Sequence, residues 1–336
     1  MSGILGAGVH VPRWRIELTE ISKAWGGEKV EGQVSVAGLD EDIFTMAVDA
    51  GAQALDNSNI KPSEIGIVCV CTATPSKFPV AARLAFALGA NPGVRVMDLG
   101  LSVRSTTQAL LSCADAVRVG SASCGMVVGV DSMLPEPGSV DEMSWGAAAA
   151  AVLVGQDEPA FSIKGVNSYS SAFTERWTVP GIKFQQQTPF PRFARDTGYV
   201  DHVWSAGSGL MNQLNLKPED LKVLVLQEST SADRTAKLLK FPQDRVLRTK
   251  SGFAFGDTGC AAVLLGLIES SGKVVPGDLV LLISYGIGGS DAICLIAKKP
   301  EKMQTSSAKL AKLRDEKTMI DYPTLLRNRK IIGAPR

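Results

Sequence analysis

The hydrophobic and polar positions of this chain alternate between two patterns. Short apolar runs such as 65–71 are rich in β-branched residues and apolar on both faces, which is typical of strands buried in a parallel sheet. Longer runs such as 42–55 repeat apolar residues at the spacing of a helix with one buried face. Because strand-like and helix-like runs follow one another, the sequence predicts an α/β fold.

One stretch of this pattern occurs twice. Residues 59–68 read NIKPSEIGIV, and residues 215–224 read NLKPEDLKVL, which is the same pattern 156 positions later. Each copy continues with a polar turn, a helix-like run, a second helix and an apolar strand, at 126–130 in the first copy and 279–283 in the second. Two copies with so long a period exclude a solenoid and predict two homologous α/β halves.

The repeat divides the chain into four parts. We predict an N-terminal half over residues 1–160 and a C-terminal half over 206–298. Residues 161–205 interrupt the pattern with aromatic residues among glycines and prolines, and we interpret them as a lid or insertion. Residues 299–336 form a basic tail.

Charge is balanced overall and uneven along the chain. The net charge is +1, which gives no general attraction to nucleic acid or membrane surfaces. From Lys298 onward there are 11 Lys or Arg against 4 Asp or Glu, so the body is acidic and the tail basic. This asymmetry suits docking to a partner protein.

Several classes of protein are not supported by the sequence. The N-terminus lacks the basic region of a secretory signal, and the longest apolar stretch, residues 146–155, is about half of what a bilayer span needs, so a cytoplasmic location is expected. The six cysteines are scattered without a C-x-x-C pair, and there are only two histidines. We therefore expect neither a metal site nor a disulfide framework.

Three stretches carry a resemblance to a known family: residues 6–16 (GAGVHVPRWRI), residues 168–171 (SYSS) with Trp177, and residues 282–292 (LISYGIGGSDA). They resemble the archaeal-type 3-hydroxy-3-methylglutaryl-CoA synthases of the thiolase superfamily. The resemblance runs from Gly3 to about Ile332. It implies the thiolase fold, in which duplicated halves form a five-layered αβαβα architecture, and it implies chemistry on acyl-CoA thioesters.

The resemblance also implies four catalytic positions, and this chain fills them differently. The family's cysteine nucleophile, histidine base, glutamate acid and thioester-binding asparagine correspond to Val103, Gln227, Ala73 and Ala254. A shift of one residue would instead place Ser102 or Phe255 at two of them. An amide takes no proton at neutral pH, and a serine without a base is not activated. Losing one essential member of such a unit can cost on the order of 10⁶ in kcat.

Other residues offer weak substitutes. Glu228 follows Gln227 and could act as a displaced base, since a pocket can raise the pKa of a carboxylate. Cys260 follows a glycine loop and could open a helix, a setting that can lower a thiol pKa. Arg104, where the family has lysine, could contact the phosphates of coenzyme A. His10 and His202 fall at no motif position, so structural roles are expected for both.

Two functions remain open. The chain resembles synthase-like proteins without the cysteine, such as the one in the diacetylphloroglucinol acyltransferase complex. That resemblance implies a non-catalytic subunit bound to a catalytic thiolase, which carries the Claisen or retro-Claisen step, and to a small OB-fold protein with a zinc ribbon. It also implies a homodimer that joins central sheets edge to edge. The alternative is a stand-alone acyl-CoA acyltransferase, synthase or lyase with atypical catalytic residues.

Overall fold

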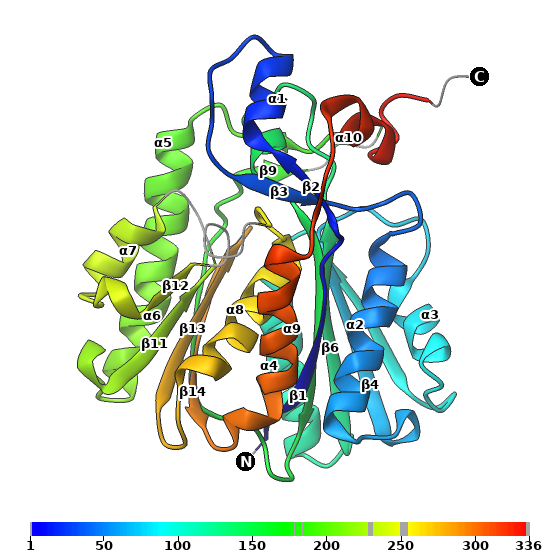
Figure 1. Ribbon diagram of the computed structural model, residues 1–336. Coiled ribbons are helices and arrows are strands. Elements are labelled where there is room, and N and C mark those ends of the chain that lie inside the picture. The colour runs from blue at the N-terminus through cyan, green and yellow to red at the C-terminus, as the bar shows by residue number, and fades with distance from the viewer. Residues whose placement is uncertain are drawn as a thin grey trace.

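The computed structural model describes residues 2–177, 179, 181–182, 184–227, 231–248 and 255–333. Within them, a ten-stranded sheet has the order β12-β11-β13-β14-β8-β1-β7-β6-β4-β5, and β1 meets β8 only at Gly3↔Ser162 and Ile4↔Phe161. On either side of this seam the strands follow one order, β1-β7-β6-β4-β5 in the first half and β8-β14-β13-β11-β12 in the second. The sheet is therefore built from two copies of one pattern (Figure 1).

The strands of the two halves correspond one to one. The first half contains β1 (Gly3–His10), β4 (Ile65–Thr72), β5 (Arg95–Gly100), β6 (Cys124–Ser132) and β7 (Ala147–Gly155). The second contains β8 (Phe161–Ser170), β11 (Leu221–Leu226), β12 (Val246–Arg248), β13 (Leu279–Gly286) and β14 (Gly289–Ala297). In each half the three strands at the outer edge are parallel, and the other two pair antiparallel.

The two halves of the sheet form two of five layers (Figure 1). Helices cover the outer face of each half and fill the space between the halves. The outer layers hold α2 (Ile43–Ser58) with α3 (Val80–Ala87), and α6 (Asp201–Gln213) with α7 (Ala232–Leu238). The central layer holds α4 (Ser105–Arg118) and α8 (Ala262–Ser270). Along β7, Ala148 and Val152 face the central layer, while Ala149 and Leu153 face α2. Both faces are buried, as the continuous apolar runs predict.

The repeated sequence forms the same turn twice. Asn59 ends α2 and Asn215 follows α6, and both adopt the left-handed conformation, with φ of 54° and 52°. Each asparagine leads into a short 3₁₀ turn, Pro62–Glu64 or Pro218–Asp220, and then into a central strand. The duplication predicted from the sequence is thus a duplication of structure.

The second half begins earlier than the sequence pattern indicates. Strand β8 lies inside residues 161–205, the range predicted as an insertion, and it pairs with β14 along its whole length. The start of α6 lies in that range as well. The polar residues Lys164, Asn167 and Ser168 hide β8 from a periodicity argument. The described residues of 171–200 form what we call the covering segment. It includes β9 (Arg176–Trp177), β10 (Gln186–Gln187), α5 (Pro191–Phe193) and a π-helical turn (Ala194–Val200).

A small cap sits over one end of the sheets (Figure 1). It contains β2 (Trp14–Glu17), β3 (Gln33–Val36), β15 (Thr318–Met319), α1 (Leu18–Ala24) and α10 (Tyr322–Asn328). The buried carboxylate of Glu142 accepts hydrogen bonds from Trp25 Nε1 (3.2 Å) and Tyr322 Oη (3.1 Å), which ties the two helices of the cap to the body.

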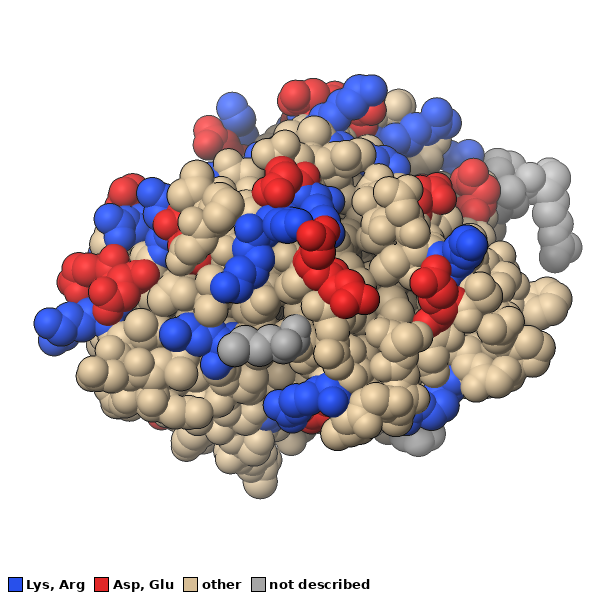
Figure 2. All heavy atoms as spheres, turned by 90° about the horizontal axis from the view of Figure 1, so that it is seen from below, with Lys and Arg blue, Asp and Glu red and all other residues tan. Residues whose placement is uncertain are grey.

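The basic tail is bound to the acidic body. Helix α9 (Gln304–Asp315), which precedes β15 and α10 of the cap, packs against α8 and β1. Lys309 lies 4.0 Å from Asp49, and Arg314 pairs with Glu269. Part of the charge asymmetry is therefore neutralised within the chain, and basic and acidic side chains are interspersed on the lower face of the molecule (Figure 2). Among the described residues, no helix is long and apolar enough to cross a membrane.

The left-handed turns give the first prediction. Asn59→Ala and Asn215→Ala should each lower the free energy of unfolding by about 1–2 kcal/mol, since a Cβ is unfavourable in this conformation and the asparagine side chain is lost. Asn59→Gly and Asn215→Gly should stay near wild type. Urea unfolding curves of the four variants measure this. Alanine variants as stable as the glycine variants would contradict the conformation.

Candidate functional site

Three of the four implied catalytic positions meet at one cavity between the halves. Ala73 follows β4, Gln227 follows β11 and Val103 precedes α4, and all three line a cavity of about 550 Å³. The carboxyl ends of parallel strands are where α/β proteins commonly bind ligands. Among the described residues that line the cavity, none is a cysteine or a histidine. Ala254 and Glu228 lie outside the described residues.

A buried carboxylate fixes the turn that carries Ala73. Asp131, at the end of β6, accepts hydrogen bonds at one oxygen from the backbone N–H groups of Ala73 and Thr74, both at 2.8 Å. Its second oxygen accepts one from Cys260 N at 2.7 Å. Burial raises the pKa of the Asp131 carboxyl, and these donors oppose the rise. One side chain thus joins the first half's turn to the second half's central helix.

Arg104 holds the turn that carries Val103. Its Nε and one terminal nitrogen donate to the fully buried Asp291 at 3.0 and 2.8 Å, and its remaining N–H groups reach Ser170 Oγ and the Gly288 carbonyl. These five hydrogen bonds match the five donors of a guanidinium. Burial acts to raise the pKa of Asp291. Hydrogen bonds from Arg104 and neighbouring hydroxyl groups outweigh it and hold this pKa below its usual value. All five donors of Arg104 thus have partners within the chain, and its expected contact with coenzyme A stays a prediction.

Gln227 also has a structural role. Its side-chain Oε1 accepts a hydrogen bond from Tyr285 N at 3.2 Å, and its backbone carbonyl accepts one from Tyr199 Oη at 2.7 Å. The residue is buried beneath the cavity. An amide at this position connects β11 with β13, and it carries no proton-accepting function.

Cys260 does not supply the missing thiol. It lies in a 3₁₀ turn just before α8, as the glycine loop predicts, but its side chain is fully buried. Burial, together with the neighbouring Asp131, raises the pKa of the thiol well above its usual value, so the helix start does not activate it. The other five cysteines are buried as well.

Neither histidine lines the cavity. His202 is buried, and its Nδ1 lies 2.5 Å from the Gly198 carbonyl oxygen while Nε2 lies 2.7 Å from Ser171 Oγ. His10 bridges Asp49 (2.7 Å) and Glu41 (2.8 Å) at the end of β1. Although burial opposes it, these two carboxylates raise the pKa of His10 to about 9. His10 thus pairs with carboxylates and His202 is held by neutral groups, which agrees with the structural roles expected for both.

Glu175 is a cavity residue that sequence reasoning missed. This carboxylate, in the covering segment, lines the cavity beside Tyr285 and Asp257. Burial raises the pKa of Glu175, and the adjacent Arg176 lowers it in part. Arg176 pairs with Asp141 at 3.1 Å, which anchors the segment over the cavity. The sequence signal for this site is the adjacent charges of Glu175 and Arg176 in a stretch rich in aromatic residues and proline. This stretch has no helix or strand periodicity from which its position could be predicted.

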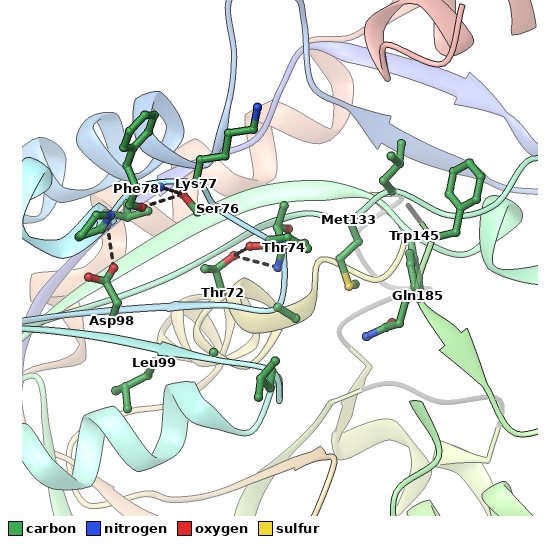
Figure 3. Close-up of a pocket in the computed structure, with 18 of the residues that line it drawn as sticks. Thr72, Thr74, Ser76, Lys77, Phe78, Asp98, Leu99, Met133, Trp145 and Gln185 are labelled. Atoms are coloured by element: carbon green, nitrogen blue, oxygen red, sulfur yellow. Dashed lines mark hydrogen bonds between the residues drawn. The ribbon is translucent and has the colours of Figure 1, made fainter. Parts of the chain in front are cut away.

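A second cavity, of about 790 Å³, adjoins the first (Figure 3). It lies between residues 72–80, the end of β5 and residues of the covering segment. Within the described residues, no group of three or more His, Cys, Asp and Glu side chains could hold a metal ion.

Five layers, duplicated halves and a cavity at the junction of the halves define the thiolase fold. The fold of a protein named MvaS, solved with 3-hydroxy-3-methylglutaryl coenzyme A, matches 100% of this chain and 93% of its own, with a TM-score of 0.83 and 18% identity. The 3-oxoacyl-[acyl-carrier-protein] synthase III of Aquifex aeolicus matches with a TM-score of 0.78 and 21% identity, over 88% of this chain and 100% of its own.

Sequence comparison defines the family. The chain is 31% identical to the hydroxymethylglutaryl-CoA synthase of Caldivirga maquilingensis, over 98% of both chains. It is 30% identical to the synthase of the same name from Methanocaldococcus jannaschii, over 99% of both chains. The chain belongs to the hydroxymethylglutaryl-CoA synthase family. No family model matches it.

The ion pair beneath Val103 gives a second prediction. Arg104→Ala should lower the free energy of unfolding by about 3–5 kcal/mol, because it leaves the carboxylate of Asp291 buried without its charged partner. Arg118→Ala, which breaks an exposed pair on the same helix, should cost less than about 1 kcal/mol. Denaturant unfolding measures both. Equal stability of Arg104→Ala and wild type would instead favour a surface role for Arg104.

Proposed function

We propose that this chain is a non-catalytic synthase-fold subunit of a complex that acts on acyl-CoA thioesters. One observation carries the proposal: Ala73, Val103 and Gln227 converge on one cavity, and none of the three can act as nucleophile, base or acid. Nucleophilic thioester chemistry needs an activated group within reach of the carbonyl carbon. A partner must therefore supply the carbon–carbon bond-forming or bond-cleaving step.

Two partners fit this role, a catalytic thiolase and a small OB-fold protein with a zinc ribbon. The resemblance to synthase-like proteins without the cysteine supports them. A coenzyme A thioester is the ligand we propose for the cavity, and similarity to structures solved with 3-hydroxy-3-methylglutaryl coenzyme A or coenzyme A supports it.

We also propose a homodimer joined through β5. This strand is one edge of the sheet, and four of its six residues are exposed. Val96 within it, Leu101 just after it and Phe86 on α3 are 40%, 74% and 88% exposed. An open strand edge beside exposed apolar side chains is prone to pair with another chain. A second copy would bury this edge and continue the sheet.

Recovery of partners from the native host tests the proposal. A tagged copy, expressed beside a second copy with a different tag, should recover that second copy, a thiolase and a small zinc-binding protein. A tagged hydroxymethylglutaryl-CoA synthase with an intact cysteine serves as the control for non-specific capture. Recovery of the chain without a thiolase, by mass spectrometry of mildly crosslinked cells, would contradict the complex.

Thiol reactivity tests whether the cavity lacks a reactive cysteine of its own. All six native cysteines are buried, so the folded wild type should react slowly with a thiol reagent. Val103→Cys should add one rapidly reacting thiol, because position 103 lines the cavity. Val117→Cys, at a buried position of α4, is the matched control and should stay unreactive. A rapidly reacting native cysteine would contradict the proposal.

The second candidate function is a stand-alone acyl-CoA acyltransferase, synthase or lyase. Glu175 favours it, since this carboxylate lines the cavity and burial raises its pKa, which are features of a candidate general acid or base. Turnover of acetyl-CoA or a 3-oxoacyl-CoA by the purified chain, lost in Glu175→Gln or in Glu228→Gln, would establish this function. The same result would exclude the non-catalytic role.

A further inference from the structure

The two cavities share part of their lining, and we call this shared part the neck. Each has its own walls, and five residues line both: Ala73, Leu101, Met133, Trp145 and Gln185. Figure 3 shows Met133, Trp145 and Gln185 together at one end of the larger cavity, with Lys77 and Phe78 at the other end. The smaller cavity holds Val103 and Gln227 beyond this neck. The two cavities therefore lie side by side, and a ligand that spans both would pass these five residues.

Ala73 has the smallest side chain of the five residues that form the neck. Its backbone N–H is held by Asp131 at 2.8 Å, so the chain cannot withdraw from the neck to make room for a larger side chain. Only a methyl group projects from this fixed position. On another wall, Leu101 adopts a left-handed conformation with φ of 67°, which leucine rarely takes, and its side chain is 74% exposed. Strain of this kind tends to occur at ligand sites.

The larger cavity has an apolar interior. Leu99, Ile182 and Phe184 line it, together with Met133 and Trp145 of the neck. Several polar groups on its walls have partners within the chain. Thr72 and Thr74 bind Asp131, and the Asp98 carboxylate accepts hydrogen bonds from the first two backbone N–H groups of α3 at 2.9 Å. Such a lining favours an apolar ligand, and its volume lies in the range of cavities that hold drug-sized molecules.

We propose that the larger cavity binds the apolar acyl or aryl group of a thioester whose carbonyl lies beside Val103 and Gln227. The neck at Ala73 admits the chain and makes the substrate class one of medium-length or aromatic acyl groups. The inference rests on the proposed acyl-CoA ligand and adds the chemistry of its acyl part.

Calorimetric titration of the purified full chain with acetyl-CoA and octanoyl-CoA tests this. Octanoyl-CoA should bind at least about tenfold more tightly, since each buried methylene contributes up to about fourfold. Ala73→Leu narrows the neck and should reduce octanoyl-CoA to the affinity of acetyl-CoA. Ala311→Leu, on the exposed side of α9, is the matched control and should keep the wild-type preference.

A second variant guards against misfolding. Gln185→Trp enlarges a different residue of the neck, on a loop rather than beside the Asp131 contact, and it should have the same effect as Ala73→Leu. Equal affinities of the two thioesters for wild type, no binding of either, or a preference that both neck variants retain would overturn the inference. Recovery of the thiolase with the tagged chain is independent of these titrations, so failure here is distinguishable from failure of the proposed function.

Discussion

The buried carboxylate of Asp131 is the contact on which the cavity depends. One oxygen holds the turn of the first half, and the other holds the backbone where the second half's central helix begins. A Cβ at position 259 would lie 2.2 Å from this carboxylate, and φ there is 56°, so a glycine is needed. Because the contact joins the two halves beneath the cavity, the shape of the cavity does not depend on side chains that perform chemistry.

This separation explains how the thiolase fold can persist without its usual catalytic groups. Arg104 and Asp291 support the turn before α4 whatever side chain stands at position 103. Gln227 connects β11 with β13 through its amide. Ala73 contributes only its backbone to the Asp131 contact. At Ala73 and Val103 the framework contacts come from atoms other than the side chain, whereas at Gln227 the side-chain amide itself makes one of them. The side chains at positions 73 and 103 can therefore differ while the fold stays intact.

The sequence predicts the framework better than the site. The repeat at residues 59–68 and 215–224 sets the two halves, because its asparagine turns and buried strands are local features. Strand β8 escapes detection because its polar residues break the apolar pattern. The ion pair of Arg104 with Asp291 and the cavity position of Glu175 are not predicted from the sequence. The tertiary fold brings these residues to their neighbours from distant parts of the chain.

The most direct test of the proposed non-catalytic role is a covalent one. The purified chain is incubated with acetyl-CoA, and its intact mass and the release of free coenzyme A are measured over time. An unmodified mass and release at the uncatalysed rate are the predicted results, because no activated nucleophile lines the described part of the cavity. An acetyl adduct that forms during turnover and maps to a residue of this cavity would contradict the non-catalytic role.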